Sequence, residues 1–139
     1  MKQGFTIIEL IVVISIIAIL ASVVMINVGK YLTTSKDSAI KGNLATLITR
    51  GAKYFDSTGS YSGFCTDPQG GAPIKTAIEA TNVGGAFTCN VKADNSVWCA
   101  CSPEKATPTT VFCVDSSGAK KEAASTTCSS ECPATAVCQ

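Results

Sequence analysis

The sequence contains no histidine, and only 15% of its 139 residues are charged. Without histidine the chain has no imidazole for nucleophilic or general acid–base catalysis, and it also lacks a GxSxG motif. The acidic residues are scattered along the chain. An enzyme is therefore the class of function that the sequence favours least, and we expect no catalytic residues and no cofactor.

A strong excess of one charge is also missing, because the formal net charge is +1. This balance argues against nucleic-acid binding through bulk electrostatics. The charge is nevertheless uneven: five basic and two acidic residues lie from Lys30 to Asp56, and five basic and seven acidic residues follow. We infer no specific nucleic-acid partner.

Proline is absent before Pro68, so nothing forces a helix to stop in the first part of the chain. Apolar residues continue at helical spacing beyond the first apolar run, at Ile40, Leu44, Leu47, Ile48 and Phe55. We predict one helix of about 50 residues, with an apolar first half and an amphipathic second half. Glycines at 29, 42 and 51 each weaken it by about 1 kcal/mol relative to alanine, and Gly29 is the obvious place for a bend.

The first apolar run extends from Phe5 to Val28 and is interrupted by a single acid, Glu9. As a helix it is roughly 36 Å long, enough to cross a hydrocarbon core of about 30 Å. A carboxylate inside a membrane is costly, so intramembrane acids usually have a function. The alternative is that Glu9 lies near the membrane interface and its carboxylate reaches water.

All eight cysteines lie in the last part of the chain, outside the apolar run. A dense, even set in a small exported domain predicts disulfides, because such a domain has too little core to stabilise itself. The basic stretch after the apolar run would by itself place this domain in the cytoplasm, but the cysteines place it outside. The disulfide candidates are Cys65, Cys89, Cys99, Cys101, Cys113, Cys128, Cys132 and Cys138.

Zinc is the alternative use of these cysteines, since Cys99-Ala-Cys101 and Cys128-x3-Cys132 offer four thiolates. The missing histidine and the lack of a paired CxxC knuckle favour disulfides, so we expect no metal. Side chains two apart on a strand share a face, so Cys99 and Cys101 should not bond to each other. We expect Cys65 to pair with Cys89 and Cys113 with Cys128, leaving Cys99 and Cys101 to take Cys132 and Cys138 in an open order.

Beyond the long helix the sequence predicts a loop over 66–73, a short helix over 74–82 and three antiparallel strands over 86–92, 96–102 and 110–116. In the first strand, alternation predicts a buried face with Phe87, Cys89 and Val91 that meets the apolar stripe of the long helix, and an opposite face in water. The tail from Ala119 is polar, so we expect only its cysteines to hold it. The fold class is α+β, with a long N-terminal helix packed on a small antiparallel sheet.

The stretch GFTIIEL, from Gly4 to Leu10, resembles the processing site of type IV pilins and related pseudopilins. The resemblance consists of a short basic leader with Lys2, glycine at the cut, phenylalanine next, Glu9 four residues further on, and then an apolar helix. It implies that a prepilin peptidase cuts after Gly4 and methylates the new amino terminus of Phe5. The segments are then a leader at 1–4, an apolar helix at 5–28, an amphipathic helix at 29–56 and a disulfide-rich head at 57–139.

The resemblance further implies that subunits leave the membrane and pack their apolar helices into a filament. Glu9 would then face the amine of Phe5 on its own or a neighbouring chain, and this charge pair would set the register of assembly. The partners would be the membrane, the peptidase, the assembly machinery and other copies of the chain. The head would lie outside the cytoplasmic membrane first and on a cell-surface filament later. Many pilins carry proline where this chain has Ile26.

Three functions compete on this evidence. The first is a structural subunit of a type IV pilus or pilus-like filament. The second is a pseudopilin of a type II secretion or DNA-uptake system, which shares the same N-terminus. The third is a bitopic membrane protein with a disulfide-rich binding head, which would keep the leader.

Overall fold

The computed structural model describes residues 4–82 and 86–139 of the chain. Most of the predicted leader, residues 1–3 with Lys2, lies outside the described residues. The chain divides into two compact units, Met1–Thr33 and Thr34–Gln139.

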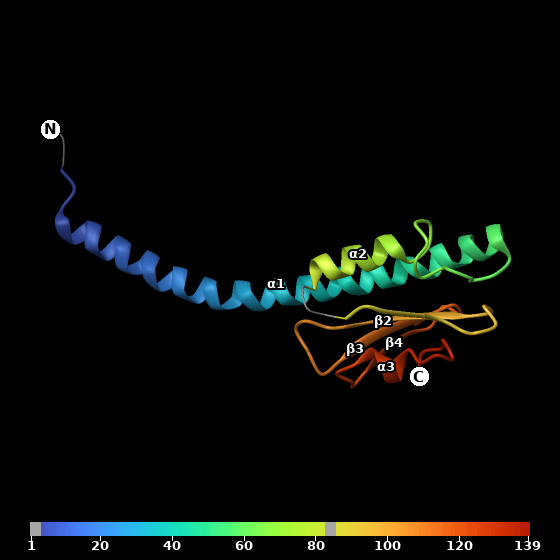
Figure 1. Cartoon of the computed structure of the whole chain (residues 1–139). Helices are drawn as coiled ribbons and strands as arrows, with labels where there is room; N and C mark the ends of the chain where they lie inside the picture. Colours follow the sequence, from blue (N-terminus) through green and yellow to red (C-terminus); the bar gives the residue numbers. More distant parts are fainter. Residues whose placement is uncertain (1–3, 83–85) are drawn as a thin grey trace. The chain divides into compact units, whose positions relative to one another are not determined.

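Helix α1 begins at Ile7 and ends at Thr58, so its 52 residues confirm the predicted long helix (Figure 1). It continues without a break through Ile26 and Gly29. In the first unit its residues are exposed from Ile7 to Leu32. In the second unit the same helix buries Ile40, Leu44 and Leu47 completely.

The second unit contains a four-stranded antiparallel sheet in the order β1-β2-β3-β4. The strands are β1 (Thr88–Val91), β2 (Trp98–Pro103), β3 (Val111–Asp115) and β4 (Lys120–Ala123). The sequence predicted only three strands, and this count is wrong. Strand β4 has the sequence KKEA, whose charged residues gave no strand signal, and pairing with β3 overrides this weak propensity.

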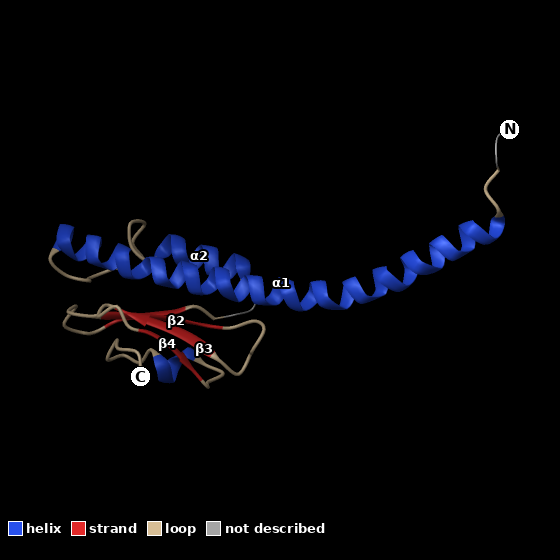
Figure 2. Ribbon diagram, turned by 180° about the vertical axis from the view of Figure 1, so that it is seen from behind, coloured by secondary structure: helices blue, strands red, loops and turns tan. Residues whose placement is uncertain are grey.

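One face of the sheet packs against the second half of α1 and against α2 (Ala72–Thr81), as Figure 2 shows. Side chains at even positions of β2 and β3 point to this face, which makes the alternation predicted for a half-buried strand. Phe55 was predicted in the buried stripe but remains 42% exposed, with its ring 5.0 Å from that of Tyr61. The core consists of Ile40, Leu44, Leu47, Tyr61, Phe64, Ile74, Ile78, Trp98, Ala100 and Val114.

The opposite face of the sheet is covered by the C-terminal tail, which includes the short helix α3 (Cys128–Glu131) (Figure 2). Here the prediction of a tail held only by cysteines is wrong, because Ala136 is also fully buried and β4 lies within the tail. The prediction that the second face of β1 lies in water is wrong as well, because the tail covers this side of the sheet. Asn90 of β1 is half-buried, and its Nδ2 donates to the carbonyl of Cys132 at 2.6 Å.

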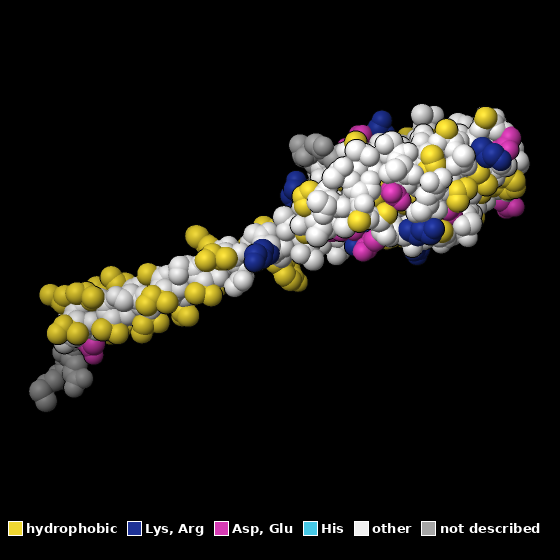
Figure 3. All heavy atoms as spheres, turned by 90° about the horizontal axis from the view of Figure 1, so that it is seen from below, with side chains coloured by type: hydrophobic (Ala, Val, Ile, Leu, Met, Phe, Trp, Pro, Cys, Tyr) yellow, Lys and Arg dark blue, Asp and Glu magenta, His cyan; other side chains and the backbone are white. Residues whose placement is uncertain are grey.

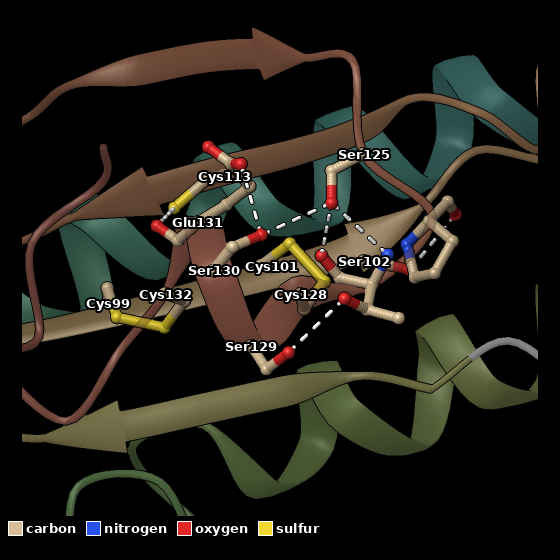
Figure 4. The surroundings of a disulfide bond; sticks show 12 residues. Cys99, Cys101, Ser102, Cys113, Ser125, Cys128, Ser129, Ser130, Glu131 and Cys132 are labelled. Atoms are coloured by element: carbon tan, nitrogen blue, oxygen red, sulfur yellow. Dashed lines mark hydrogen bonds between the residues drawn. A yellow bond between two sulfur atoms is a disulfide. The ribbon is translucent and has the colours of Figure 1, made fainter.

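Four disulfides include all eight cysteines, and three of them fasten the tail to the sheet. Figure 4 shows Cys99 and Cys101, on one strand, each bonded to a cysteine of the α3 segment. The expected pairing of Cys65 with Cys89 is confirmed, and so is the separation of Cys99 from Cys101. The expected pairing of Cys113 with Cys128 is wrong. The tail bonds are Cys99–Cys132, Cys101–Cys128 and Cys113–Cys138.

Two buried carboxylates accept hydrogen bonds that join separate segments of the second unit. Asp37 of α1 is 5% exposed and accepts hydrogen bonds from the backbone N–H groups of Lys105 and Ala106, at 2.5 and 2.8 Å. Asp115, at the end of β3, accepts from the N–H of Cys138 at 3.1 Å and from the turn at Ser117. These bonds hold the β2–β3 loop on the helix and the end of the tail on the sheet.

Two salt bridges join Lys41 of α1 to Glu104, at 3.0 Å, and to Glu122 of β4. The hydrogen bond with Glu122, together with the attraction of both carboxylates, raises the pKa of Lys41 against the opposing effect of burial. Burial on its own would raise the pKa of Glu104, but Lys41 and Thr107 outweigh it and lower that pKa. Lys41 therefore stays protonated beside the ionised carboxylate of Glu104 at neutral pH.

Candidate functional site

The first unit presents a helix whose apolar side chains have no cover within the described chain (Figure 3). In the described residues α1 is the one helix long and apolar enough to cross a membrane. Burying each large aliphatic side chain is worth about 1.5–3 kcal/mol. An apolar surface of this size needs lipid or other protein around it.

The polar side chains inside this apolar helix are satisfied by the helix itself. The hydroxyls of Ser15 and Ser22 donate to the carbonyls of Ile11 and Ile19, each at 2.7 Å. The amide of Asn27 donates to the carbonyl of Val23 at 3.1 Å. Such bonds make these residues compatible with a medium that contains no water.

Glu9 takes part in a hydrogen-bonded box at the start of α1. Its Oε2 accepts from the backbone N–H of Thr6 at 2.9 Å and from the hydroxyl of Thr6 at 2.7 Å. The hydroxyl oxygen of Thr6 in turn accepts from the backbone N–H of Glu9 at 3.3 Å. This is the reciprocal arrangement of a capping box, which satisfies N–H groups that the first helical turn leaves without partners.

Thr6 was not among the residues predicted from the sequence, although the sequence carries a signal for it. Thr6-Ile-Ile-Glu9 has a threonine three residues before a glutamate, directly ahead of an apolar run, which is the pattern of a capping box. The carboxylate therefore has a local role in starting the helix in addition to any role in assembly. Both side chains are exposed in the isolated chain.

The predicted cleavage bond, between Gly4 and Phe5, lies before the helix. Residues 4–6 have no regular secondary structure, and Phe5 is 81% exposed. Gly4 has open space around it, since an added Cβ would meet nothing within 4 Å. The backbone at this bond is therefore accessible to an enzyme that needs an extended segment.

The structure gives the cysteines no role as ligands or nucleophiles, because all eight are bonded in disulfides. Within residues 4–82 and 86–139, no three histidine, cysteine or acidic side chains come together in a group that would suit a metal ion. The zinc alternative would need thiolates that these disulfides do not provide.

Comparison with known proteins adds two findings. Residues 1–25 match the family described as the prokaryotic N-terminal methylation motif. The chain is also 40% identical over 66 residues to the type IV major pilin protein PilA of Myxococcus xanthus (strain DK1622). That alignment covers 48% of this chain and only 30% of the relative's length. No solved structure matches the chain significantly.

The matched motif contains Gly4, Phe5, Thr6 and Glu9 and the larger part of the exposed apolar helix. These motif residues lie just before α1 and in its first turn, where Thr6 and Glu9 form the capping box. By this N-terminal segment the chain is similar to type IV pilins, and the match is confined to part of the relative's length.

Proposed function

We propose that this chain is the structural subunit of a type IV pilus or of a pilus-like extracellular filament, with no catalytic role. The observation that carries the proposal is the uncovered apolar half of α1, joined to the N-terminal methylation motif. Lipid covers this helix while the subunit waits in the membrane. The helices of other copies cover it in the filament, so the same surface serves both states.

In this proposal the membrane-bound subunit has its head outside the cytoplasm, where four disulfides can form. A prepilin peptidase removes the leader after Gly4 and methylates Phe5. Assembly then moves the subunit out of the membrane and into the filament. The relative named as a major pilin supports this role, although it is matched over only part of its length.

Glu9 acts in the filament as the partner of a Phe5 amine. In the isolated chain its carboxylate is exposed and is bonded to Thr6, so the chain alone does not bear the cost of burying it. The cost appears when neighbouring helices exclude water from Glu9. A nearby amine then compensates the buried charge, and a subunit in the wrong register leaves that charge unpaired.

Intact mass measurement of this chain in sheared extracellular filaments tests the proposal. We expect the mass of a chain that starts at Phe5, with one added methyl group. Recovery in surface filaments distinguishes a pilin from a secretion pseudopilin, which would remain with the cell envelope. A chain that retains Lys2 in assembled filaments would refute our proposal, and retention of the leader on the mature chain would support the bitopic protein with a binding head.

Two substitutions of one residue separate the charge of Glu9 from its cap. Glu9→Gln keeps an oxygen that can accept from Thr6 but removes the charge, whereas Glu9→Val removes both. If the charge pair drives assembly, both variants should insert normally and yield few filaments. Normal filament yield from Glu9→Gln would leave only the capping role, and normal yield from Glu9→Val would remove Glu9 from the mechanism.

A further inference from the structure

The head contains a cavity of about 450 Å³ that the function proposed above does not use. It is lined by three residues of α1 and two of the following loop, which are Arg50, Lys53, Tyr54, Pro68 and Gln69. Its volume is in the range of about 300–1,000 Å³ that small-molecule pockets have. Two of the five lining side chains are cations and none is an acid.

Arg50 is held in place by the loop and still has donors to offer. Its Nη1 donates to the carbonyls of Gln69 at 3.2 Å and Gly70 at 3.4 Å. A guanidinium has five N–H donors, so Nε and Nη2 remain for a ligand in the fork geometry that suits carboxylate and phosphate. Among the described residues no carboxylate lies within ion-pair distance of Arg50 or Lys53.

The walls of the cavity are fixed as well. The Tyr54 hydroxyl donates to the carbonyl of Ser62 at 2.7 Å, and its ring packs edge-on against Phe64. The loop lies close because Gly70 has no side chain: a Cβ there would come within 2.2 Å of the carbonyl oxygen of Phe64. Arg50 and the Tyr54 wall are therefore preorganised, which reduces the entropy cost of binding, whereas the Lys53 side chain is exposed.

We propose that this cavity binds a phosphorylated sugar. Two cations match the charge of a phosphate monoester dianion, and the free edge of the guanidinium can donate two parallel hydrogen bonds to its oxygens. The rings of Tyr54 and Pro68 provide apolar walls for the C–H face of a sugar. This activity goes beyond the proposed function and does not require a filament, because the cavity lies within the head of one chain.

Isothermal titration calorimetry of the full chain in non-ionic detergent at low salt tests this binding. The probes are glucose 6-phosphate, glucose and inorganic phosphate. We expect glucose 6-phosphate to bind more tightly than inorganic phosphate, and glucose not to bind. Absence of binding by glucose 6-phosphate, or equal affinity for inorganic phosphate, would overturn the proposal. A phosphorylated dextran as a fourth probe tests whether the site also accepts a sugar phosphate carried on a polymer, and tighter binding of the dextran than of glucose 6-phosphate would indicate a polymer-borne ligand.

Four variants test the location of the site. Arg50→Gln and Lys53→Gln should each weaken the binding of glucose 6-phosphate about tenfold or more, because each removes a charged donor. Lys36→Gln, an exposed lysine of the same helix outside the cavity, should leave affinity unchanged. Equal weakening by Lys36→Gln would mean general charge attraction and would refute the site. Arg50→Lys keeps the charge without the fork and should bind more weakly than wild type, whereas wild-type affinity would contradict the fork.

Discussion

The glycines of α1 provide a quantitative test of how the helix packs on the sheet. By propensity alone, Gly→Ala in a helix interior stabilises a protein by roughly 0.5–1 kcal/mol. At Gly42 an added Cβ meets nothing within 4 Å. At Gly51 it would lie 2.5 Å from Nε1 of Trp98 and 2.8 Å from two carbons of the same ring. The two positions share the helix but not the surroundings.

The size of the effect at Gly51 follows from the burial of the indole. Trp98 is 0% exposed, and its ring centroid lies 4.8 Å from that of Phe64, so it has no open space into which it can move. Overpacking a core in this way costs typically 1–3 kcal/mol. After the propensity gain is subtracted, Gly51→Ala should lower the free energy of unfolding by up to roughly 2.5 kcal/mol. Gly42→Ala should raise it by roughly 0.5–1 kcal/mol.

Denaturant unfolding followed by tryptophan fluorescence measures both changes, since Trp98 is the only tryptophan. The full chain is kept in one non-ionic detergent throughout, so that the apolar helix contributes equally to each variant. The emission of Gly51→Ala in the folded state should also shift, because its indole is displaced. If Gly51→Ala proves as stable as Gly42→Ala, then α1 does not pack on the sheet as the structure has it.

Three further predictions concern a buried carboxylate, the disulfides and the capping box of α1. Burial raises the pKa of Asp115, but hydrogen bonds from Ser117, Cys138 and Ala119 outweigh it and leave the pKa below its usual 3.8. Ionised Asp115 therefore stabilises the head at pH values above 3.8, and this stabilisation is lost as the pH falls through the lower pKa of the folded state. In urea unfolding at neutral pH, Asp115→Asn should lower the free energy of unfolding by roughly 2–3 kcal/mol, and the difference from wild type should shrink in acid. Cys65 and Cys89 are half-buried, whereas the other six cysteines are at most 4% exposed. Mild reduction with dithiothreitol, followed by alkylation and peptide mapping, should therefore label Cys65 and Cys89 first. Labelling of the tail cysteines first would contradict this burial. Thr6→Val should speed amide hydrogen exchange at residues 7–10 in micelles, while Thr6→Ser should not; equal exchange in both would mean that the hydroxyl contributes nothing to the cap.

The sequence was sufficient to predict α1 because the signals along it agree. No proline interrupts it, the apolar run is continuous to Val28, and the stripe from Ile40 to Leu47 keeps helical spacing. The prediction that this stripe stays buried was wrong at Phe55, which lies near the end of the helix and remains exposed. Asp37 and Gly51 share the buried face but carry no apolar signal, so periodicity could not find them.

The tail was harder to predict because its structure depends on tertiary contacts. Lys120 and Lys121 have weak strand propensity, and pairing with β3 decides their conformation. The choice between Cys128 and Cys138 as the partner of Cys113 depends on the path of the tail across the sheet. Asp115 helps to fix that path by binding the N–H of Cys138, a contact over 23 residues that no local pattern indicates. Spacing alone leaves many connectivities open.

The position of Glu9 changes the question that the sequence raised about it. A carboxylate in an apolar run is costly where water is excluded, yet in the isolated chain Glu9 is exposed and has a local partner in Thr6. The box uses Oε2 in all its described contacts, so the other oxygen can accept a further donor. A cation that arrives with the next subunit would therefore add to the cap without replacing it. Helix initiation and subunit pairing can then use the same carboxylate, which is why Glu9→Gln and Glu9→Val must be compared.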